Sequence, residues 1–127
     1  DCPPTFEIIA HQCLQINTKE KMNRNQAMQY CQQKGGELVT PIDMDLFVKS
    51  LVDRGYVHLE NAMWIGGQFN FEENAMLWPD GTKVKEDECN FNLNGPGNCL
   101  KYSQSEVLLE TCSEELMFIC EIRFIEK

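Results

Sequence analysis

The sequence lacks several features that would assign it to other classes of protein. It has no apolar run that approaches the roughly 20 residues needed to cross a bilayer. It has no Asn-x-Ser/Thr sequon, so we do not expect N-glycosylation. It has no Cys-x-x-Cys pair, and His11 and His58 lie far apart in the sequence, which argues against a zinc site. Neither histidine has a neighbouring Ser or Cys in a recognisable motif, and no glycine-rich phosphate loop occurs, so we expect no enzymatic activity.

Positive charge is also scarce. The chain has 11 Lys and Arg against 20 Asp and Glu, for a net charge of −9. That charge repels nucleic-acid phosphates and anionic lipids, so we expect neither a nucleic-acid partner nor membrane insertion. It keeps an acidic surface solvated, and it would suit a basic partner or multivalent cations.

The length and the cysteines point to a small extracellular domain. A chain of 127 residues, 43% of them hydrophobic, fits one domain over 1–127 with an ordinary core. Seven cysteines exceed what packing needs and predict a disulfide framework in an oxidising compartment. We therefore expect a secreted, extracellular protein. The start at Asp1-Cys2 shows no signal peptide, which we interpret as a mature secreted form or an excised domain.

Local patterns predict helices early in the chain and strands later. Asn23 is expected to cap a helix that runs to about Lys34, and Asp43 a second helix that runs through Asp53. Residues 83–98 have no periodicity and read as a long loop rich in Asn, Gly and acidic residues. This order indicates an α+β fold. The expected strands cover residues 5–9, 13–16, 62–65, 76–78, 100–102, 107–111 and 117–122.

Four motifs in a fixed order carry a resemblance to a known family. They are Cys31 with Gly35-Gly36-Glu37-Leu38, then Trp64-Ile65-Gly66-Gly67, then Trp78-Pro79-Asp80-Gly81-Thr82, and finally Cys99, Cys112 and Phe118-Ile119-Cys120-Glu121. Each motif is weak alone, but in this order and spacing they are specific. From Cys2 to Glu121 the chain resembles the C-type lectin-like domain. The resemblance implies two helices packed on small antiparallel sheets with a long loop, stapled by disulfides.

The resemblance also implies how the cysteines pair, which their spacing alone does not decide. It implies the disulfides Cys2–Cys13, Cys31–Cys120 and Cys99–Cys112. Cys89 is then left over in the long loop, either as a free thiol or as a link to a partner chain. Some heterodimeric venom members of the family join their chains through this loop.

The motifs by which lectins of this family hold calcium and sugar are missing. Such lectins supply calcium ligands from a Glu-Pro-Asn or Gln-Pro-Asp tripeptide in the long loop and from a Trp-Asn-Asp motif. Here Gly95 and Gly97 flank Pro96, and Val107-Leu108-Leu109 stands at the second motif. The resemblance therefore implies that no calcium cofactor is bound at the usual site, although the loop acids leave a non-standard calcium site open.

The same region supplies the candidate ligand surface. Adjacent strand residues face opposite ways, so one of Leu108 and Leu109 is expected in the core and the other on the ligand side. An exposed leucine there would anchor a protein or a lipid-like ligand, unless the loop covers it. The candidate residues are Glu86, Asp87, Glu88, Asn90, Asn92, Asn94, Glu106, Leu108 and Leu109.

These observations predict a calcium-independent binding module that recognises a protein or a microbial surface glycan. The resemblance suggests innate immunity, and Cys89 suggests a disulfide-linked dimer. Three alternatives stay open. They are a carbohydrate-binding lectin with an unconventional site, a venom-type heterodimer subunit that acts on haemostasis, and an ice-binding protein.

Overall fold

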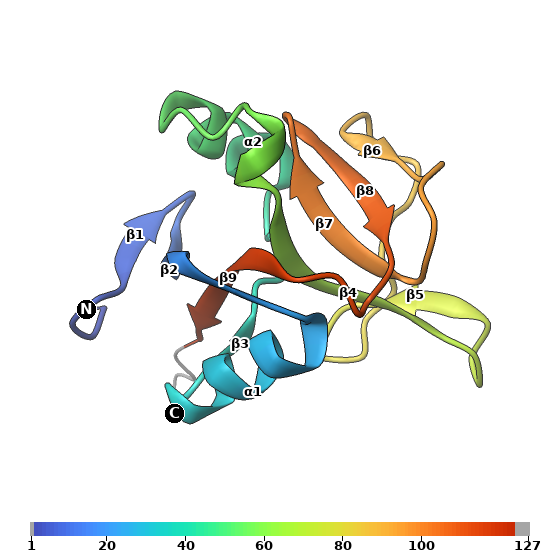
Figure 1. Ribbon diagram of the computed structural model, residues 1–127, viewed down its shortest axis with the longest axis horizontal. Coiled ribbons are helices and arrows are strands. Elements are labelled where there is room, and N and C mark those ends of the chain that lie inside the picture. The colour runs from blue at the N-terminus through green and yellow to red at the C-terminus, as the bar shows by residue number, and fades with distance from the viewer. Residues whose placement is uncertain (1, 124–127) are drawn as a thin grey trace.

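The computed structural model describes residues 2–123, and Figure 1 shows the order of the elements. The helices in that range are α1 (Arg24–Gln33), α2 (Met44–Asp53) and the short 3-10 helix η1 (Leu59–Asn61). The strands are β1 (Glu7–Ile9), β2 (Gln12–Met22), β3 (Glu37–Leu38), β4 (Met63–Asn70), β5 (Ala75–Leu77), β6 (Phe91–Asn92), β7 (Cys99–Ser103), β8 (Glu106–Glu110) and β9 (Leu116–Ile122). None of the described helices is long and apolar enough to span a bilayer.

The two α-helices begin at the expected caps. The Asn23 side chain accepts a hydrogen bond from the Gln26 amide, and the Gln26 side chain accepts one from the Asn23 amide, which forms a capping box. The Asp43 Oδ1 atom accepts a hydrogen bond from the Leu46 amide at 3.1 Å. Gly35, just beyond α1, has a φ of 89°, a conformation that glycine adopts without strain. The predicted helix limits are therefore correct to within a residue.

The strands form one hydrogen-bonded network within residues 2–123, in the order β1-β2-β9-β4-β7-β8-β6. β3 pairs with β9, and β5 pairs with β4. Most pairs are antiparallel, but β4 runs parallel to β9 and β6 runs parallel to β8. In Figure 1, α2 and α1 lie on opposite sides of the central strands.

Two strands extend well beyond their predicted limits. β2 continues to Met22 because it pairs along most of its length with β9. β4 continues through Gly66-Gly67 to Asn70, where it pairs with β5 and β7. Glycine weakens a strand signal in the sequence, but close packing requires it here. A Cβ atom on Gly66 would lie 2.6 Å from the Pro79 ring.

Three disulfides within the described residues join distant elements. Cys2–Cys13 closes the N-terminal hairpin, Cys31–Cys120 ties α1 to β9, and Cys99–Cys112 ties β7 to the segment after β8. These are the pairs that the resemblance implies. Cys31 and Cys120 are 89 residues apart, and in the chain-entropy model a loop of that length stabilises the fold by about 4–5 kcal/mol.

The core has two parts that lie on opposite sides of the central strands. The larger part includes Phe47 of α2 with Ile65 and Tyr102. The smaller part lies under α1 and surrounds Trp64, which is fully buried and donates a hydrogen bond from Nε1 to the Met22 carbonyl oxygen at 2.9 Å. Trp78 is 9% exposed and belongs to the larger part, so both tryptophans are core residues.

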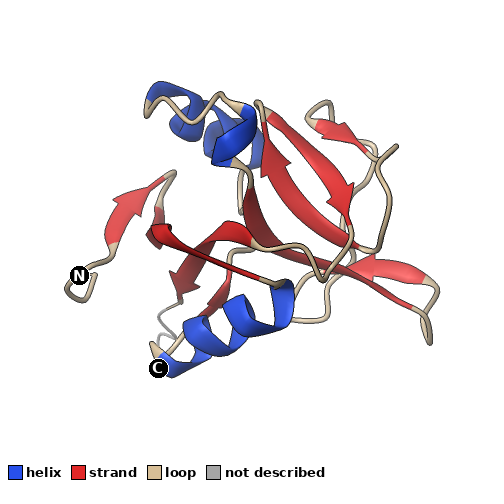
Figure 2. Cartoon of the chain, viewed as in Figure 1, coloured by secondary structure: helices blue, strands red, loops and turns tan. Residues whose placement is uncertain are grey.

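The segment between β5 and β7 is mostly loop, as expected (Figure 2). It contains one element that the sequence did not predict, the two-residue strand β6. A strand of two residues shows no periodicity, so its position comes from pairing with β8. This pairing brings the long loop to the outer edge of the sheet.

Candidate functional site

The hairpin of β7 and β8 presents two faces with different chemistry. Lys101 pairs in register with Leu108, and Cys99 pairs with Glu110, so these side chains share one face. The opposite face carries Leu100, Tyr102 and Val107, which are fully buried in the core. We call the first side the outer face, and define it by Asn92, Asn94, Lys101, Leu108 and Glu110.

An ion pair crosses the outer face. The Lys101 Nζ atom donates to the Glu110 Oε1 atom at 2.7 Å, and both side chains are only 15% exposed. The Thr111 amide donates to the second carboxylate oxygen at 2.9 Å. Burial alone would raise the pKa of Glu110, but the hydrogen bonds from Lys101 and Thr111 and the lysine charge together hold it below its ordinary value. Both oxygens of the Glu110 carboxylate therefore accept hydrogen bonds from the protein.

The two adjacent leucines of β8 have separate roles. Leu109 is half-buried and packs against the larger core. Leu108 is half-buried on the outer face, and within residues 2–123 it packs against neither part of the core. The long loop thus leaves the Leu108 side chain partly exposed beside the ion pair of Lys101 and Glu110.

The long loop closes over the edge of β8. Asn92 pairs in register with Leu108, and the Asn94 side chain donates to the Asn92 Oδ1 atom at 2.7 Å. A Cβ atom on Gly95 would clash with the Leu109 carbonyl oxygen, and one on Gly97 with the Glu110 carbonyl oxygen. The loop therefore needs glycine at both positions that flank Pro96.

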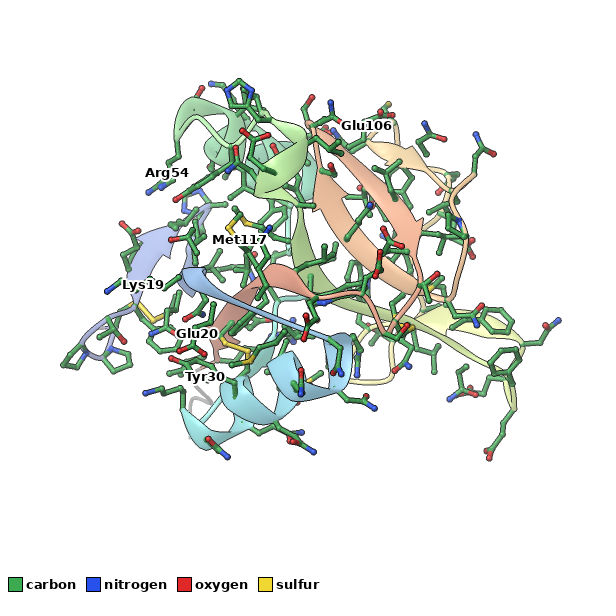
Figure 3. The ribbon with its side chains drawn as sticks, in the orientation of Figure 1. Lys19, Glu20, Tyr30, Arg54, Glu106 and Met117 are labelled. Carbon is green, nitrogen blue, oxygen red and sulfur yellow. A yellow bond between two sulfur atoms is a disulfide. The ribbon has the colours of Figure 1, made fainter. Side chains whose placement is uncertain are left out.

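The remaining candidate residues are more scattered. Glu86 and Asp87 are exposed, Glu88 is half-buried, and Glu106 is exposed at the β7–β8 turn, where Figure 3 labels it. Asn90 accepts a backbone hydrogen bond from the Val107 amide at 2.8 Å. Within residues 2–123, no side-chain hydrogen bond or ion pair joins the three loop acids to the outer face. No three His, Cys, Asp or Glu side chains of that range gather to hold a metal ion.

The comparison with protein families matches this architecture. The family model described as "Lectin C-type domain" matches residues 20–122, which is most of the chain. The chain belongs to the C-type lectin domain family.

The chain is similar to proteins with different names and ligands. Natural killer cells antigen CD94 of Mus musculus is 26% identical over 117 residues, which cover 89% of this chain and 62% of that protein. The chain thus spans less than two thirds of that relative. The C-type lectin domain of murine dendritic cell inhibitory receptor 2, solved in complex with an N-glycan, has a TM-score of 0.76 at 15% identity, covering 98% of this chain and 100% of that one.

A calcium-independent type II antifreeze protein is also similar in structure. Its TM-score is 0.73 at 22% identity, covering 95% of this chain and 93% of that one. Likenesses at these identities show the fold alone. Since the fold carries both a glycan complex and an antifreeze protein, it does not by itself decide what this C-type lectin domain binds.

Two residues of the outer face escaped the sequence reasoning, namely Lys101 and Glu110. The turn between β7 and β8 sets the register that brings them together. Gln104 and Ser105 both have positive φ, as in a tight two-residue hairpin. Counting back from such a turn gives the register, but the positive φ values are visible only in the structure.

Cys89 lies in the long loop of this C-type lectin domain, and its thiol is exposed and free in the described part of the chain. The six other cysteines form the framework disulfides. Cys89 is therefore placed where a second chain can reach it.

Proposed function

We propose that this C-type lectin domain is a calcium-independent binding module that recognises a protein through the outer face. The observation that supports this most is the Lys101–Glu110 ion pair beside Leu108. Calcium needs six to eight oxygen ligands, and Glu110, the carboxylate of the outer face, is already neutralised by Lys101. A partly exposed leucine surrounded by polar side chains instead provides the apolar centre and the polar rim of a protein contact.

The first experiment measures the melting temperature with millimolar calcium and with a chelator. A ligand at about 100 times its dissociation constant stabilises the fold by about 2.7 kcal/mol, a shift of several degrees for a domain of this size. We expect no such shift. A rise of several degrees in calcium that the chelator abolishes would refute calcium independence.

The second experiment separates protein from glycan recognition. Binding to cells of the source species should survive chelation and enzymatic removal of glycans, but should be lost after surface proteolysis. Leu108→Glu should abolish the binding, because it places a charge on the apolar contact. Leu59→Glu is the matched control, since Leu59 is 66% exposed on η1 and lies off the outer face. Binding that survives proteolysis but not glycan removal would favour the carbohydrate-binding alternative.

A finer part of the proposal concerns setting and assembly. We infer an extracellular domain that acts in innate immunity, supported by the similarity to natural killer cells antigen CD94 and by the disulfide framework. A disulfide between Cys89 and a partner chain would present the outer face next to that partner. The acidic residues Glu86, Asp87 and Glu88 before Cys89 favour a basic partner chain over a second acidic copy.

A further inference from the structure

A hollow of about 510 Å³ lies between α1 and the β4–β5 hairpin. α1 contributes Arg24 and Gln32, and β4 and the turn after it contribute Gln68 and Glu73. In Figure 1 the end of α1 where Arg24 lies faces the segment that follows β5. No residue of this hollow belongs to the outer face, so the two are separate features of the molecule.

Arg24 is an unusual residue for the wall of such a hollow. It is only 8% exposed, and burial lowers its pKa. Its Nη2 atom donates to the Gly66 carbonyl oxygen at 3.0 Å, while its Nε atom is buried without a partner. None of the ion pairs within residues 2–123 includes Arg24. A guanidinium stays charged in proteins, so the wall of the hollow holds a positive charge that takes part in no ion pair among the described residues, although Glu37 and Glu73 line the same hollow.

The other polar groups of the hollow limit what could neutralise that charge. Glu37 and Glu73 also line it, and they would repel a ligand with several negative charges. The net charge of −9 repels polyanions over a longer range as well. Carboxylates accept hydrogen bonds from hydroxyl groups, and the amide groups of Gln32 and Gln68 both donate and accept them. The hollow therefore suits one negative charge combined with hydroxyl groups.

We propose that this hollow binds a small organic carboxylate that also carries hydroxyl groups, with its carboxylate paired to Arg24. A guanidinium binds a planar carboxylate in a defined geometry, and charge-assisted hydrogen bonds are stronger than neutral ones. The carboxylate of the ligand forms the ion pair that Arg24 does not make with any of the described residues. This site is independent of the protein recognition proposed for the outer face.

The experiment is an NMR titration that follows the Nε–H signal of Arg24. Glucuronate is the probe, glucose is its neutral analogue, and sulfate is a bare inorganic anion. Glucuronate should shift the Arg24 signal in a saturable manner, glucose should leave it unchanged, and sulfate should bind more weakly. Equal responses to glucose and glucuronate, tighter binding of sulfate, or no response to any probe would overturn the proposal.

Variants place the ligand in the hollow. Arg24→Gln should weaken glucuronate binding by about 10- to 100-fold, the loss expected for a hydrogen-bonded charge. A second test does not depend on a buried residue. Glu73→Gln should tighten binding, because it removes a repulsive charge and keeps a hydrogen-bond acceptor. Glu72→Gln is the matched control, since Glu72 is an exposed neighbour that does not line the hollow. Equal affinities for the two glutamine variants would contradict the proposed location even if Arg24→Gln failed to fold.

Discussion

At the scale of single residues, the described part of this domain pairs one largely buried positive charge and leaves another without an ion pair. Lys101 and Glu110 neutralise each other on the outer face at 2.7 Å. Arg24 has no such partner within the described residues and lies in a hollow. A neutralised ion pair does not attract a free ion, whereas a buried charge without an ion pair favours a ligand of opposite charge.

The ion pair predicts a specific dependence of stability on pH. The pKa of Glu110 is lowered in the folded state, so the unfolded state binds more protons as the pH falls. This stabilisation is complete above the unfolded pKa of about 4.3 and is lost as the pH falls through the folded pKa. We expect Glu110→Gln to remove this part of the acid dependence in urea unfolding measured from about pH 7 to about pH 3.

Glu106→Gln is the matched control for that measurement, because Glu106 is exposed on the same strand and takes part in no ion pair among the described residues. It should leave the acid dependence of the free energy of unfolding unchanged. Equal acid dependence in the wild-type protein and Glu110→Gln would show that the ion pair contributes nothing to stability.

At the scale of secondary structure, local signals set the helices, and pairing sets the short strands. α1 and α2 begin at Asn23 and Asp43 because those side chains accept amide hydrogen bonds that the first turn leaves free. β6 has no such local cause and exists through its contact with β8. The helices should therefore respond to changes at single capping residues.

The cap of α2 offers a direct test. We expect Asp43→Ala to lower the free energy of unfolding by about 1 kcal/mol, since the Leu46 amide loses its acceptor. The melting temperature should fall by roughly 3–5 °C. Asp43→Asn keeps the acceptor and should cost less. Asp45→Ala, an exposed change in the same turn, is the control and should cost only a few tenths of a kcal/mol. Equal losses for Asp43→Ala and Asp45→Ala would count against the cap.

At the scale of the whole molecule, the disulfides link the elements and leave one thiol outside. Cys31–Cys120 and Cys99–Cys112 anchor α1 and β7, while Cys89 lies exposed in the long loop. An exposed thiol in an oxidising compartment tends to pair with another chain. The long loop is therefore the place in the described residues where we expect a partner chain to be linked.

We expect native protein to run as a disulfide-linked heterodimer on a non-reducing gel, and as single chains after reduction. Recombinant protein alone should be monomeric, with a minor homodimer, because Glu86, Asp87 and Glu88 of two copies repel each other and salt screens this repulsion. Cys89→Ser should abolish both linked species and leave the melting temperature unchanged. Native material that is monomeric, with Cys89 alkylated as a free thiol, would show this expectation to be wrong.

The sequence by itself determined the family, the helix limits and the absence of the usual calcium motifs. The helix limits and the missing calcium motifs depend on residues that are close along the chain, and the family depends on short motifs whose order and spacing can be read directly. A cap and its turn lie within four residues, and Val107-Leu108-Leu109 is one short segment. The resemblance then implied the three framework disulfides that the structure contains.

Only the tertiary structure decided which charges are paired and which are buried. Lys101 meets Glu110 because a two-residue turn sets the register of β7 and β8. Arg24 is buried because α1 packs beside the strand that carries Gly66, 42 residues later in the chain. Burial and ion pairing depend on contacts between segments that are far apart in the sequence. The residues next to each position therefore say little about either property. The outer face and the Arg24 hollow are therefore consequences of packing between distant segments.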